Sequence, residues 1–195
     1  MDTAMRRLAL CLLILFNGFA FGKPSEKLPM PKELQAKELP GFGLDTKDGG
    51  GTYNAVTNNE KLKELAKQRN SRRVVFSFFA TWCVPCQEGL KLLSDNSEEL
   101  KKREILVVLV NVAEKDLENY NHGKIEGWLK ENKYIKEGWL LAFDLFSNTL
   151  NDFGLSKNND NVPLPRTLVT DSNLHPLMLI GYEGDDFLQI LWSNL

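Results

Sequence analysis

The chain has 195 residues, 43% of them hydrophobic and 26% charged, and a formal net charge of −2 at pH 7. A chain of this length accommodates one domain with a well-buried core and is too short for two domains of ordinary size. Its small negative charge gives no electrostatic reason to bind polyanions, so we expect no nucleic-acid partner.

The first residues have the pattern of a secretory signal peptide. Arg6 and Arg7 precede an apolar run over residues 8–16, which contains Cys11, and a small-x-small exit, Ala20-Phe21-Gly22, follows. The run is shorter than the roughly 20 residues that span a bilayer, which makes an uncleaved membrane anchor the less favoured alternative. We therefore expect residues 1–22 to be an export signal and the protein to act in the periplasm or on the outer face of the cytoplasmic membrane.

The next segment predicts a tether followed by a single domain. Residues 23–38 combine prolines with lysines and glutamates, which is typical of a loosely ordered lead-in, and the domain is expected over residues 39–195. Its first element is predicted to be a short hairpin from residues 42–44 to the region of Tyr53, with the glycines 49–51 in the turn.

A helix and two buried strands are predicted next. Asn58 or Asn59 can cap a helix with one apolar face. The runs over residues 74–79 and 105–112 are apolar except for Ser77 and Asn111 and rich in β-branched and aromatic residues, which favours strands buried on both faces and hence a parallel sheet. The helix predicted over residues 87–102 connects them, so the three elements form a right-handed crossover.

The second half predicts alternating helices and strands without an internal repeat. The expected elements are a helix over residues 124–133, a strand over 140–144, a helix over 148–153, a hairpin of strands 167–170 and 177–180, and a last helix after Asp185.

Two cysteines three positions apart are the strongest chemical signal in the chain. Cys83 and Cys86 end the stretch FSFFATWCVPC at residues 76–86, and they are the only cysteines left once the export signal is removed. A bridge between residues so close closes a very small loop, so it removes little entropy from the unfolded chain and stabilises little. Such a pair is better suited to forming and breaking a disulfide than to stapling the fold.

The predicted position of the pair explains how it would react. Because a helix follows the strand, its N-terminal N–H groups and dipole favour a thiolate on Cys83. Cys86, one turn later, can attack the resulting mixed disulfide. Pro85 fits the first turn of a helix without losing a needed N–H.

A metal site is the competing interpretation of two such cysteines. A closed zinc site needs four ligands, and the expected mature chain adds only His122 and His175, neither with a second ligand at a typical spacing. We expect no metal and no cofactor other than the redox-active disulfide.

The residues around the pair resemble a known superfamily. The stretch F-x-A-T-W-C-V-P-C is similar to the active-site strand and turn of thioredoxins, and Pro165-Arg166-Thr167 with Asp171 resembles the pattern around their cis-proline. The resemblance implies a cis bond before Pro165, with Pro163 as the less favoured candidate. It also implies that Leu164 presents backbone groups to a substrate strand.

More narrowly, the chain resembles the TlpA/ResA-type envelope thioredoxins. The resemblance implies an α/β, thioredoxin-like fold: a central mixed β-sheet flanked by helices, with an insertion at residues 113–140 between the βαβ half and the ββα half. It implies a protein-disulfide reductase for protein thiol/disulfide substrates, active in cytochrome c maturation and fed by a membrane thiol donor of the DsbD/CcdA type. We expect the protein to be a monomer. Two alternatives stay open: a thioredoxin-fold binding or chaperone module, and a thiol peroxidase of the same fold.

Several positions depart from the family pattern. Ser77 stands where thioredoxins often have a buried aspartate, and Val84 stands where ResA-like proteins often have glutamate, so we expect no buried carboxylate to accept a proton from Cys86. Glu88 is nearby in sequence, but a solvated position on the helix is the favoured interpretation.

Trp82 and Arg166 are expected to influence the cysteine pair without reacting themselves. Trp82 is expected to shape a docking surface. Arg166 is expected either to lie near Cys83 and favour its thiolate, or to point to solvent.

Overall fold

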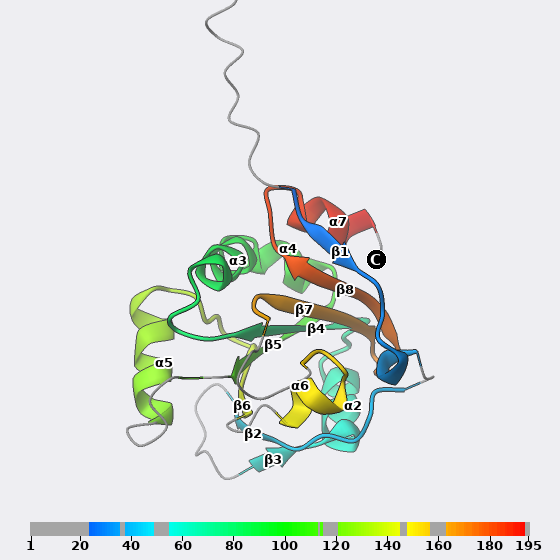
Figure 1. Cartoon of the computed structure of the whole chain (residues 1–195). Coiled ribbons are helices and arrows are strands. Elements are labelled where there is room, and N and C mark those ends of the chain that lie inside the picture. Colours follow the sequence, from blue (N-terminus) through cyan, green and yellow to red (C-terminus); the bar gives the residue numbers. More distant parts are fainter. Residues whose placement is uncertain are drawn as a thin grey trace, which may run out of the picture.

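Figure 1 shows the computed structural model of the protein, which describes residues 24–35, 38–48, 55–112, 114, 121–144, 148–156 and 163–193. The expected export signal and the predicted turn at residues 49–51 lie outside these residues. The helices and strands in chain order are β1 (Glu26–Leu28), the 3-10 helix η1 (Lys32–Leu34), β2 (Leu44–Asp48), β3 (Ala55–Thr57), α2 (Asn59–Gln68), β4 (Arg73–Phe79), α3 (Val84–Asp95), α4 (Ser97–Lys102), β5 (Ile105–Val112), α5 (His122–Glu131), β6 (Leu140–Asp144), α6 (Asn148–Asp152), β7 (Arg166–Asp171), β8 (Pro176–Tyr182) and α7 (Phe187–Ser193).

The strands form one mixed sheet in the order β1-β8-β7-β4-β5-β6-β2-β3. Strand β4 pairs in parallel with β5, and β5 pairs in parallel with β6. The other neighbours are antiparallel. The predicted α/β fold with a central mixed sheet is therefore confirmed, and α5 and β6 lie between the βαβ unit and the final hairpin as expected.

The helices cover both faces of this sheet (Figure 1). Helices α2 and α6 supply apolar side chains to the core on one face, where they meet alternate residues of β4 such as Phe76 and Phe78. Helices α3, α4, α5 and α7 cover the other face, where Val75 and Phe79 point. Both faces of β4 and β5 are thus buried, which is why their sequences are almost entirely apolar.

Most of the predicted elements are confirmed, but one helix is divided. The single helix predicted over residues 87–102 is wrong, because the chain forms α3 and then α4 with a break at Asn96. At the break the backbone of Asn96 takes φ −108° and ψ 20°, and its side chain donates a hydrogen bond to the carbonyl of Leu92 at 2.9 Å. An asparagine side chain that bonds to a backbone carbonyl of the preceding turn competes with the helix hydrogen bonds and favours such an interruption.

The expected tether contributes to the fold. Strand β1 pairs antiparallel with β8, and Leu34 of η1 is 1% exposed in the core under α2 and α6. The sheet therefore begins before residue 39, and the picture of a loosely ordered lead-in does not fit residues 26–34. Among the described residues, no helix has the length and hydropathy to cross a membrane.

Candidate active site

Cys83 and Cys86 form a disulfide at the carboxyl end of β4, with their Cα atoms 5.3 Å apart. Cys83 is the N-cap of α3, and the backbone N–H of Cys86 donates to its Sγ at 3.3 Å. Pro85 lies in the first helical turn, as predicted. A sulfur that accepts a helix N-terminal N–H is placed to carry negative charge once the disulfide is reduced.

The two sulfur-bearing residues lie beneath an exposed apolar rim. Cys83 and Cys86 are 4% and 2% exposed, whereas Trp82 and Val84 are 42% and 62% exposed. Among the residues described, these are two of only three large hydrophobic side chains that are exposed. Exposed apolar side chains therefore lie next to the buried disulfide.

A carboxylate holds the loop that leads into the pair. Glu114, after β5, accepts hydrogen bonds from the N–H and the hydroxyl of Thr81, both at 2.8 Å, and from the side-chain amide of Asn111 at 2.7 Å. The side chain of Gln87 in α3 donates to the carbonyl of Thr81 at 2.9 Å. These charge-assisted bonds fix the backbone two residues before Cys83. The sequence alone gave no indication of this role for Glu114.

Pro165 lies beside this loop, and the bond between Leu164 and Pro165 is cis, as the resemblance implied. The register of β4 and β7 pairs Phe78 with Arg166, so the buried Pro165 lies next to the last residue of β4, just before the cysteine turn. Leu164 packs against the cores on both faces of the sheet.

Arg166 occupies neither of its two expected positions. Its Nη1 donates to the backbone carbonyls of Pro165 at 2.9 Å and Gly181 at 3.3 Å, where it lies with Leu28 of β1. This is the sheet face opposite α3, so the guanidinium is directed away from Cys83 and is half-buried. Burial lowers its pKa, against the opposing effect of Glu26.

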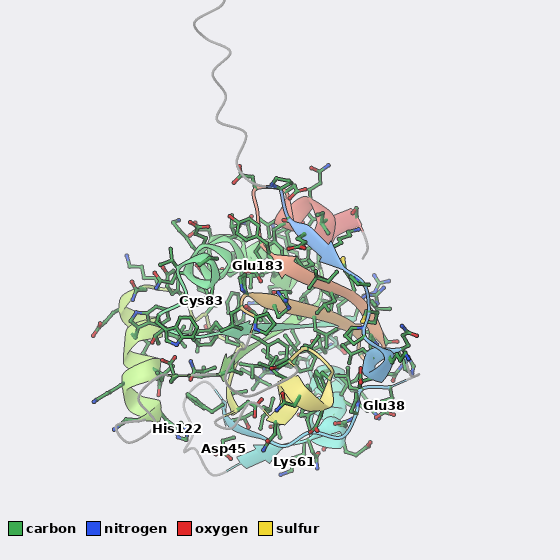
Figure 2. All side chains as sticks on the ribbon, in the orientation of Figure 1. Glu38, Asp45, Lys61, Cys83, His122 and Glu183 are labelled. Carbon is green, nitrogen blue, oxygen red and sulfur yellow. A yellow bond between two sulfur atoms is a disulfide. The ribbon has the colours of Figure 1, made fainter. Side chains whose placement is uncertain are left out.

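A carboxylate that the residues around Cys86 in the sequence did not indicate lies buried under α3. Glu183, directly after β8, is 2% exposed and accepts a hydrogen bond from the hydroxyl of Thr167. Figure 2 shows that Glu183 lies on the α3 side of the sheet, the side on which Cys83 also lies. Ser77 pairs with Thr167 in the sheet register and is also buried, so a short polar row lies under α3. Glu88, in contrast, is exposed, as expected.

The two histidines have structural neighbours instead of metal-ligand geometry. His122 begins α5 and packs against Phe143 with 4.1 Å between ring centroids, and burial lowers its pKa. His175 contacts the carboxylate of Asp171 at 2.8 Å in the turn between β7 and β8. In the described part of the chain, no three His, Cys, Asp or Glu residues gather as metal ligands would.

The comparisons with solved structures show the same fold at low sequence identity. A secreted thiol-disulfide isomerase from Corynebacterium glutamicum is 19% identical with a TM-score of 0.60, over 92% of this chain and 92% of its own. A putative thiol:disulfide interchange protein DsbE from Chlorobium tepidum is 18% identical with a TM-score of 0.54, over 86% and 98%. A yeast mitochondrial 1-Cys peroxiredoxin is 15% identical with a TM-score of 0.54, over 80% and 68%.

The family comparison covers most of the domain. No curated protein matches the chain. The model of the AhpC/TSA family matches residues 36–175, a range that contains the disulfide, Glu114 and Pro165. The thioredoxin-like fold, the disulfide at the helix N-terminus and this match agree with the resemblance to TlpA/ResA-type proteins, and the chain belongs to the AhpC/TSA family of the thioredoxin superfamily.

Proposed function

We propose that the protein is an exported thiol-disulfide oxidoreductase in which Cys83 attacks and Cys86 resolves. The observation that carries this proposal is the Cys83–Cys86 disulfide at the N-terminus of α3, buried beneath the rim of Trp82 and Val84. The apolar rim supports a protein substrate, since it offers surface on which a partner chain can pack around the sulfur atoms.

The proposed reaction transfers two electrons from the dithiol to a substrate disulfide. The Cys83 thiolate attacks one substrate sulfur, and the other leaves as a thiolate. Cys86 then attacks the Sγ of Cys83, which restores the disulfide of the protein and releases the second substrate thiol. Leu164, directly before Pro165, is proposed to offer its backbone groups to the substrate chain at the same edge, whereas the guanidinium of Arg166 is directed to the other face of the sheet.

The proposed direction is reduction of protein disulfides, with apocytochrome c as a substrate class and a membrane thiol donor of the DsbD/CcdA type as the electron source. Support comes from the TlpA/ResA resemblance and from the interchange protein and the secreted isomerase among the structural neighbours. The export signal predicted at residues 1–22 supports a site of action outside the cytoplasm. We propose that the protein acts as a monomer and without any further cofactor.

Insulin-disulfide reduction by the purified protein tests the activity. We expect turnover with dithiothreitol as donor and its loss in Cys83→Ser, whereas a binding or chaperone module would show no turnover. Equilibration of the pair with glutathione buffers tests the direction. A potential near about −270 mV supports a reductase, and one near about −120 mV supports a disulfide donor.

A thiol peroxidase is the second candidate, and the match to the AhpC/TSA family together with the peroxiredoxin neighbour favours it. In that reaction a Cys83 thiolate would attack peroxide to give a sulfenic acid, and Cys86 would condense with it to form the disulfide and water. Peroxide consumption with dithiothreitol as donor distinguishes the two, since an oxidoreductase acts on insulin and leaves peroxide unchanged.

A further inference from the structure

Glu183 is a buried carboxylate pressed against helix α3. Gly89 of that helix has no side chain, and the Glu183 carboxyl group occupies the place where a Cβ at position 89 would lie. Thr167 donates a hydrogen bond to Oε1, and within the described residues Oε2 is buried without a hydrogen-bond partner. One oxygen of this group is therefore unpartnered and faces α3.

The position of Gly89 places this carboxyl group close to Cys86. The two residues are three apart on α3, and side chains with that spacing lie on one helix face with about 5–6 Å between their Cβ atoms. The Glu183 carboxyl group is thus about that far from the Cβ of Cys86, a separation that the thiol spans directly or through one water molecule. Cys86 is 2% exposed, so bulk solvent has little access to its sulfur.

Three charged side chains on the surrounding elements bond to groups other than Glu183. Arg166 of β7 bonds to backbone carbonyls on the opposite face of the sheet. Glu88 of α3 accepts a hydrogen bond from Tyr182 of β8 at 3.5 Å, and Asp186 accepts one from the backbone N–H of Ser25 at 2.6 Å. Burial raises the pKa of Glu183 to about 7, against the smaller opposing effect of the Thr167 hydrogen bond.

We propose that Glu183 exchanges the proton of the Cys86 thiol during disulfide exchange, a role that rests on the proposed function. In the resolving step the Cys86 S–H bond breaks and its proton passes to Oε2 of Glu183. The Cys86 thiolate then attacks the Sγ of Cys83, a new S–S bond forms, and the substrate sulfur leaves with the electron pair of the broken bond. When the disulfide is reduced again, Glu183 returns the proton to Cys86.

The resolving step can be measured separately from the attack. Reduced full-length protein is mixed with oxidised glutathione, and samples are quenched with acid at intervals. Mass spectrometry then quantifies the reduced form, the Cys83–glutathione mixed disulfide and the Cys83–Cys86 disulfide in each sample. The rate at which the mixed disulfide becomes the internal disulfide is followed from pH 5.5 to 9. For wild type we expect an inflection near pH 7, where Glu183 loses its proton.

Glu183→Gln keeps the shape of the side chain and removes its ability to accept a proton. We expect the inflection near pH 7 to disappear and the resolving step at pH 7.5 to slow about 100-fold, the lower range for loss of a general base. Formation of the mixed disulfide should stay within about twofold of wild type, because it depends on Cys83 at the helix N-terminus. Glu88→Gln is the matched control on α3 and should behave as wild type in both steps.

The outcomes separate the two proposals. Wild-type protein that forms no mixed disulfide overturns the proposed function and this role with it. Wild-type resolution that Glu183→Gln reproduces at every pH overturns the role of Glu183 alone. Should Glu183→Gln not fold, the wild-type profile decides: an inflection near pH 7 supports the proposal, and a rate that only rises towards pH 9 overturns it.

Discussion

Replacing Glu183 with glutamine in the oxidised protein should change how stability depends on pH. Burial raises the pKa of this carboxyl from its ordinary value of 4.5 to about 7 in the folded protein. Below pH 4.5 the group is protonated in both the folded and the unfolded chain, so its stabilising contribution is fully present. As pH rises to about 7, the unfolded chain releases the proton first, and the folded state loses stability.

The size of this effect follows from the two pKa values. Each unit of difference corresponds to about 1.36 kcal/mol. Raising the pKa from 4.5 to about 7 therefore makes the folded protein roughly 3 kcal/mol less stable above pH 7 than it is at pH 4. Glutamine does not ionise, so the free energy of unfolding of Glu183→Gln minus that of wild type should grow by this amount between pH 4 and pH 8.

Urea unfolding of both proteins at 25 °C, with the disulfide intact so that no thiol titrates, measures this difference. Other titrating groups are common to both proteins and cancel. Glu88→Gln removes an exposed carboxyl from the same helix and is the matched control for the substitution itself. Parallel curves for Glu183→Gln and wild type would refute the assignment of a raised pKa to this carboxyl.

Three further substitutions test the packing around the site by urea unfolding. Gly89→Ala should destabilise wild type by about 1–2 kcal/mol, because the added Cβ overlaps the Glu183 carboxyl. In the Glu183→Ala background the same change should stabilise the protein by about 0.5–1 kcal/mol, since alanine is favoured over glycine inside a helix. Stabilisation in both backgrounds would contradict the contact between Gly89 and Glu183. Glu114→Ala should lower the free energy of unfolding by about 1–3 kcal/mol, because it leaves the N–H and hydroxyl of Thr81 without their acceptor. An unchanged unfolding midpoint would show that the loop before Cys83 does not depend on Glu114. Asn58→Ala should cost about 1 kcal/mol through loss of the cap on α2, whereas Asn58→Asp should not.

Much of the fold follows from local pattern. The strand predicted over residues 105–112 matches β5 and that over 140–144 matches β6, because a run of apolar residues buried on both faces needs no information from distant residues. A helix cap at Asn58 or Asn59 and the start of a helix at the cysteines could likewise be predicted from the sequence, since each depends on residues within one helical turn. The edge strand β1 was missed because its three residues gain order only by pairing with β8, at the other end of the chain.

The candidate site divides in the same way. The part played by Cys83, Cys86 and Pro85 is encoded in four consecutive residues. The positions of Glu114 and Glu183 are not, because Glu114 meets Thr81 and Glu183 meets Gly89 only after chain segments far apart in sequence have packed together. Arg166 takes neither of its two expected positions for a related reason: its pairing with Phe78 turns it to the sheet face opposite α3, where it bonds to backbone carbonyls.

The role of Glu183 can be separated from that of an ordinary core residue by the signs of its effects. A buried carboxyl with a single hydrogen bond destabilises the fold above pH 7, so its replacement should raise stability there. If the carboxyl accepts the proton of Cys86, the same replacement should slow the resolving step. A residue that only fills space would change both quantities in the same direction, since lost packing lowers stability and loosens the site together. One variant that is more stable at pH 8 and slower to resolve the mixed disulfide therefore identifies a group placed for chemistry at the expense of the fold.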